Sequence, residues 1–205
     1  MRDKILETAT DMFTRLGVRN VTMDDIARQV GISKKTIYQD FQDKKDLVNS
    51  AFKRMLDQDH EHLENILDGE DGVIENLVYT SKAMRERLTN MNPMVILEIQ
   101  KYFPQTWAIF QDFKENVIRK DIVNVLEKGK KLGYFRPEID SDILSRVRVN
   151  QINSVFESRE FMEGDKNIAD IQLEMMDHFL HGIFTEKGRK AYKNQKENNP
   201  TTTAL

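Results

Sequence analysis

Residues Lys34 to Phe41 carry the side chains best suited to chemistry in this 205-residue chain. Two lysines, a threonine, a tyrosine and a glutamine offer N–H and O–H donors within one short segment. At about 100° per residue, Ile37 and Phe41 fall on one side of a helix, and Lys35 and Gln39 point the opposite way. Such donors bind phosphate oxygens and base edges, so the segment predicts DNA binding. The alternative is an ordinary amphipathic helix with a solvated polar face.

Two short helices joined by a tight turn are expected to position these donors. Thr22, followed three residues later by Asp25, approximates a capping box and predicts a helix that begins directly after Thr22. Gly31 ends this helix, because glycine accepts the left-handed conformation common at helix C-termini. Ser33 then caps the second helix. The arrangement is a helix-turn-helix, which lays its second helix in the major groove of DNA. The buried positions of the first helix are expected at Ile26, Ala27 and Val30.

A resemblance to a known family covers about the first 50 residues. The preceding helix, the helix-turn-helix and the segment after it follow one another as in the TetR family of bacterial transcriptional regulators, which this part of the chain resembles. The residues that carry the resemblance are Phe13, Gly17, Thr22, Ile26, Ala27, Gly31, Thr36, Tyr38, Phe41, Lys44 and Leu47.

The resemblance implies roles for individual residues. Thr22, Tyr38 and Lys44 are expected to touch phosphates. Lys35, Thr36 and Gln39 are expected to face bases. The Lys34-Lys35 pair departs from the family, in which many members have a small residue or glycine before Thr36, and this departure tilts the helix towards phosphate contacts. The complete expected set of DNA-binding residues is Thr22, Ser33, Lys34, Lys35, Thr36, Tyr38, Gln39 and Lys44.

Composition favours an all-α protein, since the chain holds only four prolines and nine glycines and 32% of its residues are charged. We expect a three-helix DNA-binding domain over residues 1–46 and a helical-bundle effector-binding and dimerisation domain over 47–186. A polar, disordered tail is expected over 187–205. Residues 1–55 carry a net charge of +3 and the remainder −6, so the basic share lies with the helix-turn-helix.

The helix expected over about 167–184 favours a homodimer. Its apolar side chains cover an arc of roughly 220°, which is wider than one packing surface needs. We expect this helix and the one before it, over about 141–161, to be the last two and to pair with a second subunit. Two recognition helices would then meet successive major grooves, about 34 Å apart, on a palindromic operator. The alternative is a helix buried within a monomer.

Large apolar residues around Pro93 and Pro104 favour an effector pocket. The resemblance implies a ligand cavity in this domain, and no isolated charged residue in an apolar run marks an ionic ligand. The expected effector is therefore small and either apolar or aromatic. The alternative is that these residues are ordinary core. The expected lining residues are Met84, Leu88, Met94, Tyr102, Phe103, Trp107 and Phe110.

Other kinds of chemistry find little support. The chain has no cysteine, no nucleophile elbow and no phosphate loop, so neither an enzyme nor a cofactor is expected. His178 and His181 lie three apart beside Asp177, but no third ligand is indicated, so no metal is expected. No segment resembles a membrane span or a signal peptide, and a cytoplasmic location is expected.

These patterns together predict a homodimeric repressor that a small effector releases from its operator. Three alternatives stay open. The same fold could act as an activator, or it could regulate without an effector. A helical ligand-binding protein or enzyme could also use the N-terminal helices only for association.

Overall fold

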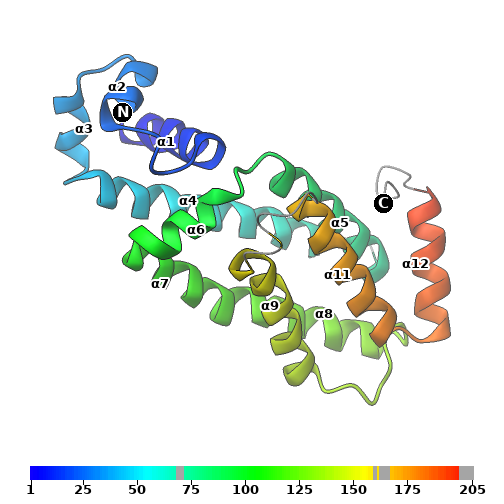
Figure 1. The fold of residues 1–205 in the computed structure, drawn as a ribbon. Coiled ribbons are helices and arrows are strands. Elements are labelled where there is room, and N and C mark those ends of the chain that lie inside the picture. Colours follow the sequence, from blue (N-terminus) through cyan, green and yellow to red (C-terminus); the bar gives the residue numbers. More distant parts are fainter. Residues whose placement is uncertain (68–71, 159–160, 162–166, 199–205) are drawn as a thin grey trace. The chain divides into compact units, whose positions relative to one another are not determined.

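The structure is a computed structural model that describes residues 1–67, 72–158, 161 and 167–198 (Figure 1). Its regular elements within these residues are all helical, which confirms the predicted all-α fold. The helices are α1 (Arg2–Leu16), α2 (Met23–Val30), α3 (Lys34–Asp40), α4 (Lys44–Leu67), α5 (Val73–Thr89), α6 (Met94–Tyr102), α7 (Pro104–Phe113), the π-helix η1 (Lys114–Ile118), α8 (Arg119–Lys131), α9 (Ser141–Glu157), α11 (Ile168–Ile183) and α12 (Glu186–Asn198).

The chain divides into two compact units. The first unit comprises Met1–Glu61 and Asn90–Phe113, and the second comprises His62–Thr89 and Lys114–Leu205. Helix α4 contributes to both units. The first unit therefore contains the three N-terminal helices together with α6 and α7. Within the described ranges, no helix is long and apolar enough to cross a membrane.

The core of the first unit follows the apolar stripes of its short helices. Ile5 and Ala9 of α1, Ile26 of α2 and Ile37 of α3 are fully buried. Leu47 at the start of α4 is also fully buried. Burial of such side chains stabilises a fold by about 1.5 to 3 kcal/mol each, so this small cluster fixes the positions of α2 and α3.

Helix α6 and the residue pair before it bind the α1–α2 region directly. The Asn92 backbone N–H donates to the Thr14 carbonyl at 2.8 Å, and the Arg19 backbone N–H donates to Glu98 Oε2 at 3.0 Å. The Arg19 guanidinium also lies over the Tyr102 ring, 4.6 Å from its centroid. These contacts explain why residues 90–113 belong to the same compact unit as the helix-turn-helix.

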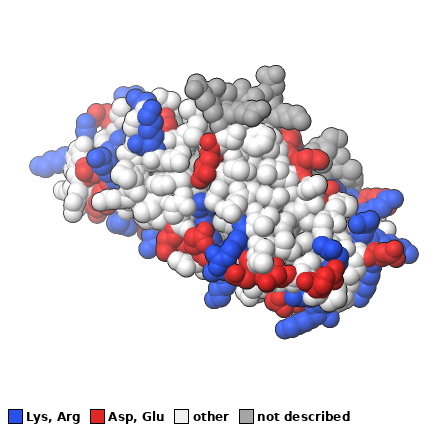
Figure 2. Space-filling view, turned by 60° about the horizontal axis from the view of Figure 1, so that its bottom comes forward, with Lys and Arg blue, Asp and Glu red and all other residues white. Residues whose placement is uncertain are grey.

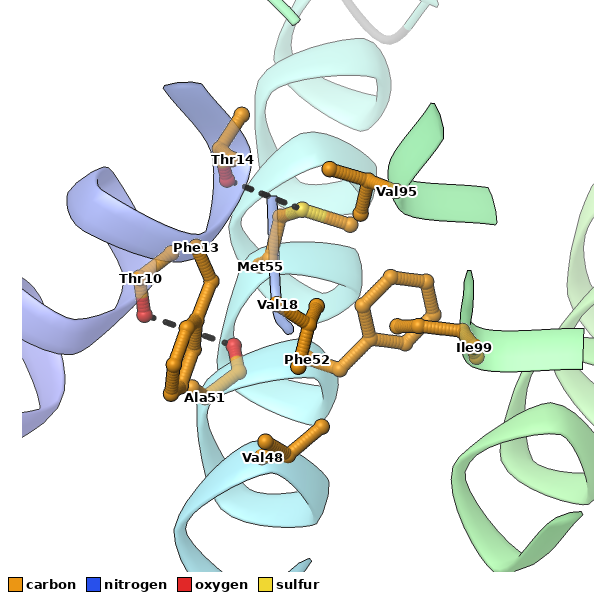
Figure 3. Close-up of a pocket in the computed structure, with 10 residues that line it drawn as sticks. All are labelled: Thr10, Phe13, Thr14, Val18, Val48, Ala51, Phe52, Met55, Val95 and Ile99. Carbon is orange, nitrogen blue, oxygen red and sulfur yellow. Dashed lines mark hydrogen bonds between the residues drawn. The ribbon is translucent and has the colours of Figure 1, made fainter. Parts of the chain in front are cut away.

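Apolar side chains fill the junction of α1, α4 and α6 (Figure 3). Phe13, Phe52 and Ile99 meet there, and the Thr14 hydroxyl points to Met55 Sδ at 3.9 Å. The cavity that remains measures about 10 Å³, which is at the lower limit for one water molecule. The junction is therefore packed core rather than a ligand site.

The second unit is built around a cluster in which α5, α8, α11 and α12 meet. Phe135 is fully buried, and its ring lies 5.7 Å from that of Phe184. Gly188 allows α12 to approach this cluster closely, because a Cβ at that position would lie 2.1 Å from the Tyr134 carbonyl oxygen. Tyr192 of α12 is 4% exposed and completes the cluster.

Helix α12 corrects the prediction of a disordered tail over 187–205. Residues up to Asn198 are helical, and positions 199–205 lie outside the described residues. The Tyr192 hydroxyl and Lys196 Nζ both donate to Asp177 Oδ1 of α11, at 3.2 and 3.0 Å. Helices α9 and α11 are therefore not the last two of the chain. The sequence prediction that they are the last two is wrong.

Most of the apolar side chains in the wide arc of α11 are buried within the chain itself. Met175 and Phe179 are half-buried. The remaining apolar members are buried in the single chain, as the alternative of a helix buried within a monomer expected. These buried members are Ile168, Ile171, Leu173, Met176, Leu180, Ile183 and Phe184.

Candidate nucleic-acid interface

A capping box fixes the start of α2, as predicted. Thr22 Oγ1 accepts from the Asp25 backbone N–H at 3.2 Å, and Asp25 Oδ2 accepts from the Thr22 backbone N–H at 3.0 Å. The Thr22 hydroxyl also donates to the Asp25 carboxylate at 2.6 Å. This hydrogen bond is the main reason why the pKa of Asp25 lies below its usual value. The Thr22 hydroxyl, which is expected to touch a phosphate, therefore also stabilises the start of α2.

The turn between α2 and α3 is short because Gly31 reverses the chain. Its φ is +80°, in the left-handed region, and its N–H donates to the Ala27 carbonyl at 3.0 Å. Ser33 then caps α3, with its Oγ accepting from the Thr36 backbone N–H at 3.2 Å. The Ser33 and Thr36 hydroxyls lie 2.8 Å apart. The helix-turn-helix is confirmed at each of these predicted signals.

Helix α3 separates its core side from its polar side. Ile37 is fully buried, and Phe41, directly after the helix, is 1% exposed. Lys35 and Gln39, one turn apart, are exposed, and Tyr38 is 45% exposed. The helix therefore presents an ammonium, an amide and a phenol group to a partner, while its buried residues hold it against the rest of the first unit.

The two other lysines of the predicted DNA-binding set are held by an ion pair or by partial burial. Lys34 Nζ donates to Asp24 Oδ2 at 2.8 Å, and this hydrogen bond raises the pKa of Lys34. Lys44 is half-buried at the start of α4, and burial is the main cause of its lowered pKa. Its neighbour Lys45 is exposed.

The predicted effector-pocket residues fall into both compact units. Met84 and Leu88 are half-buried in the second unit, whereas the other five lie on α6, α7 and the residue between them in the first unit. Phe103 and Phe110 are buried, but Met94 is 49% exposed and Tyr102 is 40% exposed. Because the seven are divided between the two units, the pocket stays a prediction.

The histidines considered for metal binding have other neighbours. His181 Nδ1 lies 2.9 Å from the Asp177 carbonyl and 3.2 Å from its carboxylate. That carboxylate also accepts from Tyr192 and Lys196. Across the residues that the structure describes, no group of three potential ligands forms a metal site.

Known proteins resemble the chain in both sequence and structure. Residues 5–51 match the family described as bacterial regulatory proteins, tetR family. The HTH-type transcriptional repressor KstR2 of Mycobacterium tuberculosis is 30% identical over 148 residues, which cover 71% of this chain and 74% of the repressor. A solved structure of KstR2, described as a ketosteroid transcriptional regulator, matches with a TM-score of 0.59 at 26% identity, and the match covers 90% of this chain and 95% of that chain.

A more distant structure shares the fold. The transcriptional regulator FadR from Bacillus subtilis, solved in complex with stearoyl-CoA, matches with a TM-score of 0.62. It is 17% identical, and the match covers 89% of this chain and the whole of FadR.

Proposed function

Because the chain belongs to the TetR family of bacterial regulatory proteins, we propose that it is a homodimeric repressor released from a palindromic operator by a small effector. Members of this family are DNA-binding transcriptional regulators and not enzymes, and this chain is a regulator of that kind. Its relation to the repressor KstR2 supports the negative sign of regulation. The proposal places the protein in the cytoplasm, together with the DNA it binds.

The observation that carries the proposal is the exposed polar side of α3 above the buried Ile37. Lys35 and Gln39 project from this side, one turn apart, and their N–H groups suit base acceptors in the major groove. Tyr38 and Lys44 are assigned to phosphates, which position the protein without specifying sequence. Thr22, Ser33, Lys34 and Thr36 complete the proposed contact set.

A second copy of the chain would cover the outer side of α9 and the neighbouring edge of α11. Ile143 and Val147, one turn apart on α9, are 57% and 41% exposed. Met175 and Phe179 of α11 are only half-buried. Figure 2 shows a wide area without charged side chains on the face that it presents. Exposed apolar side chains on one side of a helix favour a subunit interface, and twofold symmetry of the protein predicts a palindromic site.

An effector is supported by a regulator of the same fold that was solved with a ligand, FadR in complex with stearoyl-CoA. The name of KstR2 as a ketosteroid transcriptional regulator is compatible with this proposal. We assign the effector to the second unit, with Met84 and Leu88 as its proposed contacts there. The other five residues of the expected lining, Met94, Tyr102, Phe103, Trp107 and Phe110, lie in the first unit and stay a prediction from the sequence.

The test begins with DNA fragments from the organism that encodes the protein. Purified protein is incubated with these fragments at moderate salt, and the retained DNA is sequenced. We expect an enriched inverted repeat, because two recognition helices in a dimer read two half-sites. Retention that depends on salt but not on sequence would contradict a specific operator and would favour a role of the N-terminal helices in association.

A matched pair of variants then tests the recognition helix. Lys35→Ala is expected to change sequence preference at one base position by ~1 to 3 kcal/mol. Lys82→Ala, which removes an exposed lysine of α5, is the control and is expected to leave the preference unchanged. Equal preference of the Lys35→Ala variant and the wild type would contradict the base-reading role.

A same-fold activator is one alternative that stays open, beside regulation without an effector. Transcription from a promoter that carries the enriched site separates the two signs of regulation. Higher expression after deletion of the coding gene supports a repressor, whereas lower expression supports an activator.

A further inference from the structure

Arg148 is a buried cation in the second unit. Its side chain lies on the inner side of α9, is 6% exposed, and its Nη1 has no hydrogen-bond partner among the residues that the structure describes. Burial alone lowers its pKa to about 10, with no contribution from a neighbouring acid. A buried charge without a partner costs stability, so its presence calls for a reason beyond packing.

The nearest acid on the same helix is already occupied. Asp142 Oδ2 accepts from Arg146 Nε at 3.1 Å, and Asp142 Oδ1 accepts from Arg119 Nη1 at 2.8 Å. Both of these arginines are more exposed than Arg148. The helix therefore pairs its outer arginine with an acid and leaves the inner one without any.

Two amide oxygens, one on the same stretch of α9 and one on α11, also lack partners among the described residues. Gln172 of α11 donates through Nε2 to the Ile152 carbonyl, one turn after Arg148, at 2.8 Å. Its Oε1 is buried without a hydrogen-bond partner, and so is the Oε1 of Gln151. A guanidinium donor and two amide acceptors thus lie along little more than one turn of α9.

The adjoining segment has unusual backbone geometry. The π-helix η1 begins at Lys114, which is 1% exposed and donates to Asn153 Oδ1 at 2.6 Å. Short π-helical segments occur frequently at functional sites. A second buried cation therefore contacts the same stretch of α9 from a distorted helix.

Arg148 shares one side of α9 with two half-buried residues. Leu144, one turn before it, and Gln151, three residues after it, are both half-buried. All three side chains share one side of α9 at 100° per residue. A small molecule bound on this side of α9 would meet side chains that are only half-buried on either side of the guanidinium.

We propose that Arg148, with Gln151 and Gln172, binds the carboxylate or phosphate of an effector that also carries an O–H or N–H donor. The anion would pair with the guanidinium, and the donor would satisfy the amide oxygens. This inference rests on the proposed function and replaces the uncharged effector expected from the sequence. Arg148 stands between Val147 and Val149, and was missed because its burial appears only once α9 is placed.

The test uses the full chain and matched probes that differ only in charge. The probes are 6-hydroxyhexanoate and 6-hydroxyhexanamide, with 6-hydroxyhexyl phosphate to separate a carboxylate site from a phosphate site. We expect calorimetry to give at least about tenfold tighter binding of one anion than of the amide, since charge-assisted hydrogen bonds are the stronger ones.

Variants of two arginines on the same helix assign this preference. In Arg148→Gln and Arg148→Met the anion and the amide are expected to bind within about threefold of each other. Arg146→Gln removes an outer arginine and is expected to keep the tenfold preference. Two different replacements at position 148 guard against a misfolded variant, which circular dichroism would reveal.

Three results would overturn the inference. The first is equal binding of the anions and the amide to the wild type, and the second is an intact preference in the Arg148 variants. The third is a weakened dimer in those variants, which would mean that Arg148 pairs with an acid of a second copy. Operator binding by the wild type without a probe is measured in parallel, so that failure of the proposed function is recognised separately.

Discussion

The two compact units differ in whether all of their buried polar groups have hydrogen-bond partners. In the first unit, all of whose residues the structure describes, no buried side-chain nitrogen or oxygen lacks a hydrogen-bond partner. Thr10, for example, donates to the Leu6 carbonyl, and Thr106 donates to Asn49. The second unit buries Asn76 Oδ1 and Thr80 Oγ1 without partners, in addition to the atoms near Arg148.

This difference fits two different tasks. A recognition helix must meet DNA in one fixed orientation, which favours a scaffold whose polar groups are all satisfied. A domain that binds a ligand gains from polar groups that find their partners only when the ligand is present. The first unit is therefore expected to respond to core mutations as a rigid scaffold does, whereas the second is expected to gain stability when unpartnered groups are removed.

The largest expected effect is the loss of packing under the recognition helix. Ile37→Ala should lower the free energy of unfolding by ~2 to 5 kcal/mol, because Ile37 is fully buried. Urea denaturation followed by circular dichroism measures this loss. Gln39→Ala, on the exposed side of the same helix, is the control and should change stability by less than about 0.5 kcal/mol. A similar small effect at Ile37 would mean that the first unit is not rigid.

The second-largest expected effect is a gain in stability instead of a loss. Arg148→Met removes a buried cation that lacks an acidic partner and is expected to raise the free energy of unfolding by about 1 to 3 kcal/mol. The same denaturation experiment applies, without added ligand. Arg146→Met, at an exposed position, should not stabilise the chain. Destabilisation by Arg148→Met would remove the contrast between the two units.

A smaller loss is expected at the start of α2. Thr22→Ala breaks both halves of the capping box and should cost ~0.5 to 2 kcal/mol of stability. It should also weaken operator binding, because the hydroxyl is a proposed phosphate contact. Thr89→Ala, at the exposed end of α5, serves as the control. Unchanged stability with weakened binding would assign Thr22 to DNA contact alone.

The smallest effect is expected where α6 meets the α1–α2 region. Glu98→Gln weakens the bond that Glu98 Oε2 accepts from the Arg19 backbone N–H. The cost should be about 0.2 to 1 kcal/mol, because the contact is exposed. Glu174→Gln, at an exposed site of α11, is the comparison variant. A clear drop in operator affinity beyond this stability loss would show that α6 orients the DNA-binding helices.

Local signals made the helix-turn-helix predictable from sequence. Thr22, Gly31 and Ser33 act through hydrogen bonds or backbone angles within a few residues, so their types and spacing were sufficient. The same reasoning failed for α12, whose apolar content is low. Tyr192 is buried only because Gly188 lets the helix approach Tyr134, a contact that spans more than 50 positions.

Features that depend on distant contacts could not be predicted from the spacing of apolar residues. The π-helix η1 lies between α7 and α8, and no apolar repeat marks where a π-helix inserts. The division into units also depends on Glu98 and Asn92, which bind backbone groups of the α1–α2 region far away in sequence. Such contacts follow from the fold and not from the local pattern.

The attachment of α6 and α7 to the first unit has a consequence for how the protein is made. The N-terminal helices leave the ribosome first, but their compact unit is complete only with residues 90–113. Because Asn92 and Glu98 supply contacts that the nascent N-terminus lacks, the DNA-binding helices are expected to consolidate only after Phe113 has emerged. A growing chain would thus acquire operator binding only after residue 113. Most of the second unit lies in the 92 residues that follow.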